Sequence, residues 1–133
     1  LEGEHFSAYV PFAARWPLEV HLVPHRQVAD LAELRDDERD DLTAVYLELL
    51  ARVDGLYSTP TPYIAAWHQA PLDSRFRPAS RLHLQLTSPR RAEDKLKFLA
   101  GSEAAMGAFI NDTVPEQVAA QLRAAVPATA RKG

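Results

Sequence analysis

A strict alternation of leucines with polar side chains between residues 81 and 89 constrains the fold more than any other feature. Leucine occupies every second position and polar residues occupy the positions between, namely Leu82, Leu84 and Leu86 against His83, Gln85 and Thr87. Because successive side chains of a β-strand point to opposite faces, the leucines face a hydrophobic core. The sequence therefore predicts a sheet with one covered face and one face that is available for chemistry.

Three further segments predict strands beside this one. They cover residues 6–11, 18–23 and 63–68, and residues 13–17 join the first two as an antiparallel pair. In the second strand the apolar Leu18, Val20 and Leu22 share one face, whereas Glu19 and His21 share the other. A polar loop, residues 72–80, turns the third strand back into the leucine strand.

Helical spacing appears in three places. The clearest helix carries acidic residues at its start and ends at Asp54 and Gly55, where we expect a left-handed glycine cap; its apolar positions are Leu42, Val45, Tyr46, Leu49, Leu50 and Val53. A second helical pattern runs over residues 93–98, and glycines at 101 and 107 interrupt it. The last helix begins at a capping-box spacing, Thr113 to Glu116, with proline in the first turn and an apolar stripe of Val118, Leu122 and Val126.

Strands and helices in this order predict an α+β domain with an antiparallel sheet that helices cover on one side. The chain has 133 residues, of which 47% are hydrophobic, which suits one domain, residues 4–126, with a frayed tail at 127–133. Cysteine is absent, which excludes disulfides and thiolate ligands. No apolar run reaches membrane-spanning length and no signal peptide is visible, so we expect a cytoplasmic protein. With 15 basic and 18 acidic residues spread along the chain, nucleic acid is not an expected partner.

Four segments together carry a resemblance to a known family. They are residues 15–19, 63–71, 81–89 and 97–103, which follow one another in the family's order. Over residues 2–126 the chain resembles the C-terminal half of galactose-1-phosphate uridylyltransferase, in the histidine-triad superfamily. The resemblance implies a histidine-triad-like antiparallel sheet, a half-barrel with packed helices. It also implies that the chain begins midway along the parent enzyme, as a separate subunit or as a fragment.

His68 and His83 are the strongest candidates for metal ligands. Neutral imidazole is a common ligand, and two neighbouring strands can bring ring nitrogens to one ion. The resemblance implies iron or zinc at these positions, with a third ligand at Gln85 and a glutamate from the other half of the enzyme. An amide oxygen is a weak ligand for such metals, so zinc or iron here stays an open question. The alternative is that both histidines are hydrogen-bonding strand residues.

The segment after Pro89 offers candidates for sugar-phosphate contacts. In the family, this segment crosses the dimer and grips the hexose phosphate, and its matching residues here are Lys97, Phe98, Gly101, Ser102 and Glu103. Lysine is a compact cation that suits phosphate, and a carboxylate accepts paired hydrogen bonds from sugar hydroxyls. The alternative is that Lys95, Lys97 and Glu103 form a solvated helix face. The preceding pair, Arg90 and Arg91, is interpreted as surface charge.

No run of histidines suits a nucleophile. A histidine-triad nucleophile needs His-Pro-His or His-x-His-x-His, and neither run occurs. We therefore expect an inactive isolated chain, and a nucleotidyltransferase only when the missing N-terminal half supplies the histidine. The implied substrates are UDP-glucose and hexose 1-phosphate, in galactose metabolism, and a homo-oligomer, a dimer in the family, is expected. The alternative is a non-catalytic histidine-triad-like module that binds a nucleotide sugar or dimerises.

Overall fold

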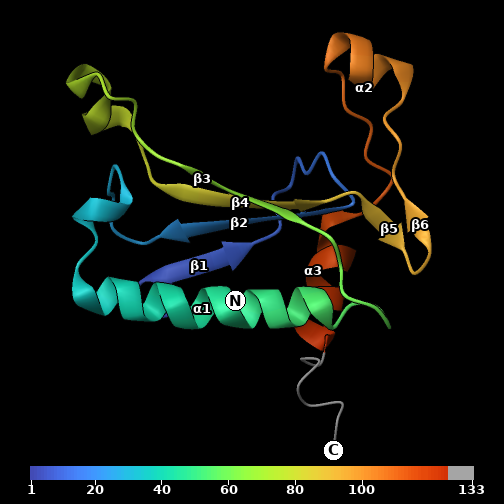
Figure 1. Ribbon diagram of the computed structural model, residues 1–133, viewed down its shortest axis with the longest axis horizontal. Helices are drawn as coiled ribbons and strands as arrows, with labels where there is room; N and C mark the ends of the chain where they lie inside the picture. Colours follow the sequence, from blue (N-terminus) through green and yellow to red (C-terminus); the bar gives the residue numbers. More distant parts are fainter. Residues whose placement is uncertain (126–133) are drawn as a thin grey trace, which may run out of the picture.

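A four-stranded antiparallel sheet lies at the centre of the chain, and helices cover one of its faces (Figure 1). The computed structural model describes residues 1–125. The strands are β1 (Phe6–Tyr9), β2 (Leu18–Pro24), β3 (Ile64–His68) and β4 (His83–Ser88), in the order β1-β2-β4-β3. Helices α1 (Asp36–Asp54) and α3 (Pro115–Ala124) contribute side chains to the same core. The predicted α+β architecture and all four predicted strands are confirmed.

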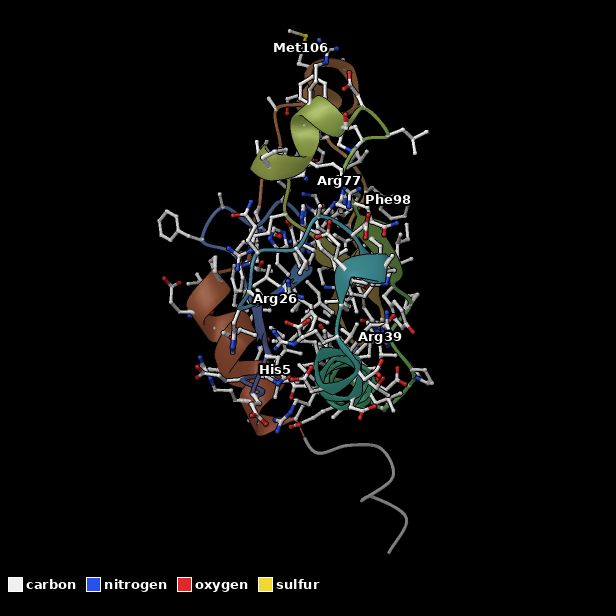
Figure 2. The ribbon with its side chains drawn as sticks, turned by 90° about the vertical axis from the view of Figure 1, so that its left-hand side faces the viewer. His5, Arg26, Arg39, Arg77, Phe98 and Met106 are labelled. Atoms are coloured by element: carbon white, nitrogen blue, oxygen red, sulfur yellow. The ribbon has the colours of Figure 1, made fainter. Side chains whose placement is uncertain are left out.

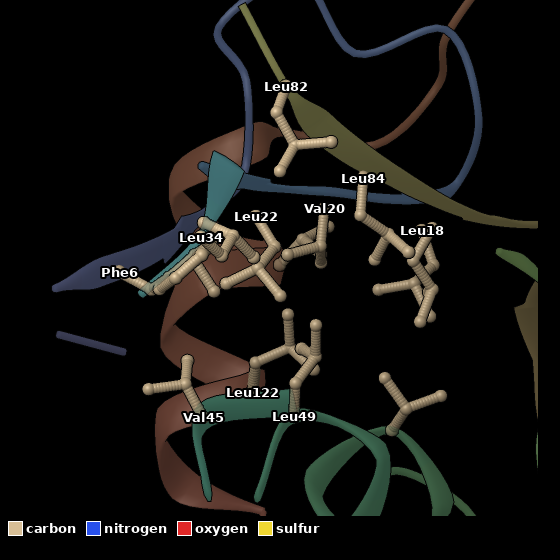
Figure 3. Packing of buried hydrophobic residues seen from close by; sticks show 14 of the residues in the cluster. Phe6, Leu18, Val20, Leu22, Leu34, Val45, Leu49, Leu82, Leu84 and Leu122 are labelled. Carbon is tan, nitrogen blue, oxygen red and sulfur yellow. The ribbon is translucent and has the colours of Figure 1, made fainter. Parts of the chain in front are cut away.

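Two leucines of β4 and the leucine just before it form the centre of the core. Leu82, Leu84 and Leu86 are all 0% exposed, whereas the polar residues between them are half-buried on the opposite face. Across the core, Leu49 of α1 and Leu122 of α3 point toward Val20 of β2 (Figure 3). The predicted alternation in β4 is therefore confirmed, and the burial of three large leucines fixes the register of the central strand.

Acidic side chains near the start of α1 attach the helix to the rest of the domain. The Glu38 carboxylate accepts the backbone N–H of Arg35 at 2.9 Å, and it also accepts Arg26 Nε at 2.8 Å and Arg26 Nη2 at 2.7 Å. The Arg26 guanidinium holds the pKa of Glu38 at about 2, well below its ordinary 4.5. The predicted acidic start is confirmed. The predicted left-handed cap is wrong: Gly55 has φ −81°, and its N–H reaches the Ala51 carbonyl at 3.0 Å by continuing the right-handed turn.

The chain between β4 and α3 differs from its predicted structure. The expected helix over residues 93–98 is wrong, because β5 (Arg90–Ala92) and β6 (Lys95–Leu96) form a hairpin whose turn is made by residues 93 and 94. A short helix, α2 (Gly101–Met106), begins at a glycine that the sequence predicts to interrupt a helix, and it ends at Gly107 in the left-handed region, with φ 65°. We call residues 89–112 the arm.

The start of α3 also needs a correction. Pro115 occupies the first turn as predicted, but Thr113 does not cap the helix, because Val114 is the N-cap residue. The Thr113 hydroxyl instead donates to Asn111 Oδ1 at 2.9 Å and to the Pro17 carbonyl at 3.3 Å. Val118 and Leu122 are buried, as the predicted stripe requires. Val126 and the predicted tail, 127–133, lie outside the described residues.

Two projections rise from the sheet on the side away from α1 (Figure 1). One is the loop between β3 and β4, which contains the 3-10 helix η2 (Ser74–Ala79). A second 3-10 helix, η1 (Leu31–Glu33), lies beneath it, and Arg77 of η2 pairs with Asp30 at 2.7 Å and with Glu33 at 2.5 Å. The other projection is the arm with α2. Among the helices described, none is long and apolar enough to cross a membrane.

Gly3 gives a first prediction, because the backbone there passes close to α1. Asp41 accepts three backbone N–H groups from residues 4–6, and a β-carbon at Gly3 would lie 2.6 Å from the Asp41 carboxylate and 2.6 Å from Val45 Cγ2. We expect Gly3→Ala to lower the free energy of unfolding by about 1–3 kcal/mol through overpacking. Urea unfolding measures this. Gly101→Ala is the matched control, since no atom lies within 4 Å of its β-carbon position, and equal losses in both variants would contradict the prediction.

Candidate functional site

The uncovered face of the sheet carries a row of aromatic rings. We call it the histidine face, after His21, His68 and His83. His68 of β3 and His83 of β4 are partners in the strand register, and their rings stack with centroids 4.7 Å apart and an interplanar angle of 7°. The His21 ring lies 6.3 Å from His83, and Tyr9 lies edge-on to His21 at 5.7 Å. Gln85 is opposite His21 in the register. The sequence therefore placed His68, His83 and Gln85 correctly on one face, on adjoining strands.

Hydrogen bonds orient two of these imidazoles. His83 Nδ1 lies 2.9 Å from the Arg81 carbonyl, which can only accept, so Nδ1 is the donor in this hydrogen bond. His21 Nε2 lies 3.1 Å from the carboxylate of Glu19, which is buried and also accepts the backbone N–H of Arg15 at 2.8 Å. Sequence reasoning gave Glu19 and His21 no role. Their shared face was visible in the alternation of β2, but the buried carboxylate was not.

The histidines do not form a complete metal centre by themselves. Two imidazoles stacked nearly parallel do not aim their lone pairs at one point, and a catalytic zinc needs three protein ligands. Within residues 1–125, no three side chains of His, Asp, Glu or Cys are placed to hold a metal ion. This chain therefore does not fit iron or zinc unless further ligands come from outside it.

A second prediction tests this conclusion. Gln85 lies next to His83 along β4 on the same face, so Gln85→His would add a third imidazole there. We expect the variant to bind Zn²⁺ at least about tenfold more tightly than the parent chain, because imidazole is a better ligand for zinc than an amide oxygen. Competition against a chromogenic chelator measures the affinity. Thr87→His, one step further along the same face, is the control, and equal zinc affinity in both variants would contradict the prediction.

The five sugar-phosphate candidates all lie on the arm. Lys97 and Glu103 form a buried ion pair, with Nζ 2.5 Å from Oε1 and side chains that are 7% and 1% exposed. Lys97 Nζ also donates to the carbonyls of Arg15 at 3.1 Å and Ile110 at 2.5 Å. Glu103 accepts the N–H groups of Ala100 at 2.7 Å and Ile110 at 3.0 Å. The alternative of a solvated face for Lys97 and Glu103 is therefore wrong.

The other candidates on the arm are open to solvent. Phe98 is 87% exposed, and Gly101 and Ser102, in the first turn of α2, are exposed as well. Figure 2 shows Met106, which is 80% exposed, at the far end of α2 from the body of the domain. The arm thus presents a glycine, a hydroxyl and apolar side chains on its surface, above a buried ion pair.

Aromatic rings and an asparagine connect the arm to the loop before β2. Lys97 Nζ lies 5.8 Å from the Trp16 ring centroid and 5.9 Å from that of Phe109, distances typical of cation–π contacts. Asn111 Nδ2 donates to the Ala14 carbonyl at 2.9 Å. Sequence reasoning missed Asn111, because no local pattern links it to a loop nearly a hundred residues earlier. The histidine face and the arm lie at opposite ends of β4, so the two groups of candidates form separate clusters.

The Lys97–Glu103 pair predicts a dependence of stability on pH. The Lys97 ammonium, followed by the N–H groups of Ala100 and Ile110, lowers the pKa of Glu103 from 4.5 to about 2. A lowered pKa in the folded state gives stability that is fully present above pH 4.5 and is lost as the pH falls toward 2. We expect the pH dependence of unfolding between these limits to be shallower in Glu103→Gln than in the parent chain. Urea unfolding at a series of pH values measures this dependence. Equal slopes of the free energy of unfolding against pH in the two proteins would contradict the prediction.

Arg90 corrects another expectation. Its side chain is buried, donates to the carbonyls of Thr59 and Pro60 at 3.1 Å each, and lies over the Tyr57 ring at 4.5 Å. The guanidinium therefore fixes the segment that leads into β3, and its interpretation as surface charge is wrong. Arg91, by contrast, is exposed and pairs with Asp112.

Similarity to known proteins identifies the family of this chain. The sequence pattern of the galactose-1-phosphate uridyl transferase C-terminal domain matches residues 1–132. The chain belongs to this family. A galactose-1-phosphate uridylyltransferase of Thermotoga maritima is 40% identical over 126 residues, which cover 92% of this chain and 39% of that protein. The chain therefore spans about two fifths of the length of this relative.

Solved structures agree with the family and its fold. A uridylyltransferase mutant superposes with a TM-score of 0.85 at 37% identity, covering 93% of this chain and 41% of the other. A zinc-bound histidine triad family protein from Mycobacterium smegmatis superposes with a TM-score of 0.57 at 20% identity, over 93% of this chain and 79% of that one. The second likeness concerns the fold alone. The predicted membership of the galactose-1-phosphate uridylyltransferase family and the predicted histidine-triad-like fold are both confirmed.

Proposed function

We propose that this chain, as domain 4–126, is the C-terminal part of a UDP-glucose:hexose-1-phosphate uridylyltransferase. The complete enzyme moves a uridylyl group between glucose 1-phosphate and galactose 1-phosphate. The observation that carries this proposal is the match of the C-terminal domain family to residues 1–132. Supporting it, the T. maritima relative is more than twice as long, so a whole enzyme of that size has room for a second domain.

The arm supplies the sugar-phosphate contacts in this proposal. Its exposed residues Phe98, Gly101 and Ser102 face the substrate, and Gly101 lets a ligand approach the backbone because no atom lies within 4 Å of its β-carbon position. Lys97 contributes positive charge, and the buried Glu103 carboxylate holds that ammonium in place. The apolar tip of the arm contacts a second copy of the protein, which makes the enzyme a homo-oligomer.

The nucleophilic histidine comes from the N-terminal half of the transferase. No His-Pro-His or His-x-His-x-His run occurs in this sequence, so the chain contributes scaffold and contacts and is inactive alone. The partner half has an open edge to pair with. In the described part of the chain, β3 is bonded only to β4, and Tyr63 and Ile64 at its start are exposed. The opposite edge is partly closed, because Glu2 bridges to Ser7 of β1.

Co-expression with the N-terminal half tests the proposed function. We expect exchange of label between glucose 1-phosphate and UDP-glucose only when both chains are present. Ser102→Trp, which places a large ring on the exposed surface of α2, should raise the KM for hexose 1-phosphate with folding retained. Arg75→Trp, on the other projection, is the control.

Two outcomes would contradict the proposal. Exchange by the purified chain alone would show that its own residues supply a nucleophile. A stable complex with the N-terminal half and no exchange would favour the alternative, a non-catalytic module that binds nucleotide sugars or dimerises.

A further inference from the structure

A cavity of about 150 Å³ opens on the covered side of the sheet, away from the histidine face. Its floor is made by Ala8 of β1 and Val20 of β2, and its walls are made by Leu49 of α1 and Leu122 of α3. Figure 3 shows Val20, Leu49 and Leu122 converging from the sheet and from both helices. The cavity therefore lies where β1, β2, α1 and α3 meet.

The size and the apolar walls determine what enters this cavity. A volume of about 150 Å³ is enough for a molecule the size of benzene. Val20, Leu49 and Leu122 give the cavity an aliphatic surface, whereas Tyr9 and two arginines are the polar members of its lining. A small molecule with an apolar body and one polar end therefore suits this lining.

Two guanidinium groups line the same cavity and give it a charge. Arg52 is held in place, since its Nε and Nη2 bond Glu48 at 2.9 and 2.6 Å and its Nη1 donates to the Leu122 carbonyl at 3.1 Å. Arg123, in the last turn of α3, is exposed, and its guanidinium forms no ion pair with any residue between 1 and 125. One positive charge at the cavity is therefore left for an anion.

Tyr9 connects the cavity to the histidine face. It lines the cavity, and its ring also lies edge-on to His21, with centroids 5.7 Å apart. Val20 lines the cavity and directly precedes His21 on β2. A molecule in the cavity would therefore lie next to Tyr9, whose ring is also in contact with His21.

We propose that this cavity binds a small apolar anion, an aryl or short-chain alkyl carboxylate. The apolar part lies against Val20, Leu49 and Leu122, and the carboxylate pairs with the Arg123 guanidinium. Charge complementarity selects an anion, and the volume limits the apolar part to about the size of one benzene ring. This site is independent of the proposed transfer reaction, because it lies on the opposite face of the sheet from His68 and His83.

Benzoate is the probe, and nuclear magnetic resonance of the labelled full chain is the measurement. A ligand of this size should bind with a Kd of about 1 mM, shifting the amide signals of Ala8 and Ala119 and the ring signal of His21. Ala119→Phe fills the cavity from α3 and should abolish these shifts, whereas Ala120→Phe, on the exposed side of the same helix, should leave them. Ala119→Leu serves if the larger side chain disturbs the fold.

The charge has its own control. Arg123→Gln should weaken benzoate binding about tenfold and leave the binding of neutral benzyl alcohol unchanged. The proposal is overturned if benzoate gives no saturable shifts, if Ala119→Phe and Ala119→Leu both bind it as the parent chain does, or if Arg123→Gln leaves its affinity unchanged.

Discussion

Leu84→Ala is expected to lower the free energy of unfolding by about 3–5 kcal/mol. Leu84 is 0% exposed on β4, a strand with neighbours on both sides, and its register partners are Leu22 of β2 and Trp67 of β3. Truncation removes buried methyl groups and leaves a cavity that two hydrogen-bonded neighbours cannot close.

Urea unfolding followed by circular dichroism measures this loss. Leu72→Ala is the matched control, because the Leu72 side chain in the loop before η2 is 105% exposed and its truncation should change the stability by less than about 0.5 kcal/mol. A loss below about 1 kcal/mol for Leu84→Ala would contradict the central place given to β4. His83 and Gln85 flank Leu84, so the same variant should also broaden the signals of the histidine face.

Lys97→Met should reduce uridylyl exchange by the reassembled enzyme about 10²-fold. The ammonium joins the arm to Arg15 and Ile110, and its loss leaves the Glu103 carboxylate buried without a cation. A misplacement of about 1 Å at a substrate-holding segment costs about 10²-fold in rate. Hydrogen exchange of the arm measures the structural part of this effect, and the exchange assay measures the functional part.

Lys95→Met removes the same charge from an exposed position two residues earlier, and it should change neither measurement. The double variant Lys97→Met/Glu103→Gln removes both charges. The arm should therefore regain its protection against hydrogen exchange, while the rate of uridylyl exchange stays low. Equal losses of uridylyl exchange in Lys95→Met and Lys97→Met would contradict the prediction, because they would show that the rate depends only on the net charge of the arm.

The strands and helices that could be predicted are those in which one buried face makes apolar residues recur at regular spacing along the sequence. Leu82, Leu84 and Leu86 alternate because one face of β4 is covered, and the spacing of Val45, Leu49 and Val53 in α1 has the same cause. The arm escaped prediction because it buries few apolar side chains, and its hairpin depends on distant contacts, such as those of Arg90 with Thr59 and Pro60.

The candidate site was predictable to a similar degree. His68 and His83 were placed side by side because strand alternation and the hairpin order decide which face each one occupies. The pairing of Lys97 with Glu103 could not be predicted, because the start of α2 separates the two residues and a glycine at position 101 disfavours a helix there. Glu19 was hidden for a related reason, because its burial depends on the loop of residues 13–17 folding back over it.

The ammonium of Lys97 has three hydrogens, and Arg15, Ile110 and Glu103 already accept all of them. Any phosphate that binds this nitrogen must displace one of these acceptors. The net binding free energy is therefore far smaller than that of a new ion pair with an unpaired ammonium. In the proposed enzyme, a product phosphate held by such an exchange of near-equal bonds would leave as readily as it arrived.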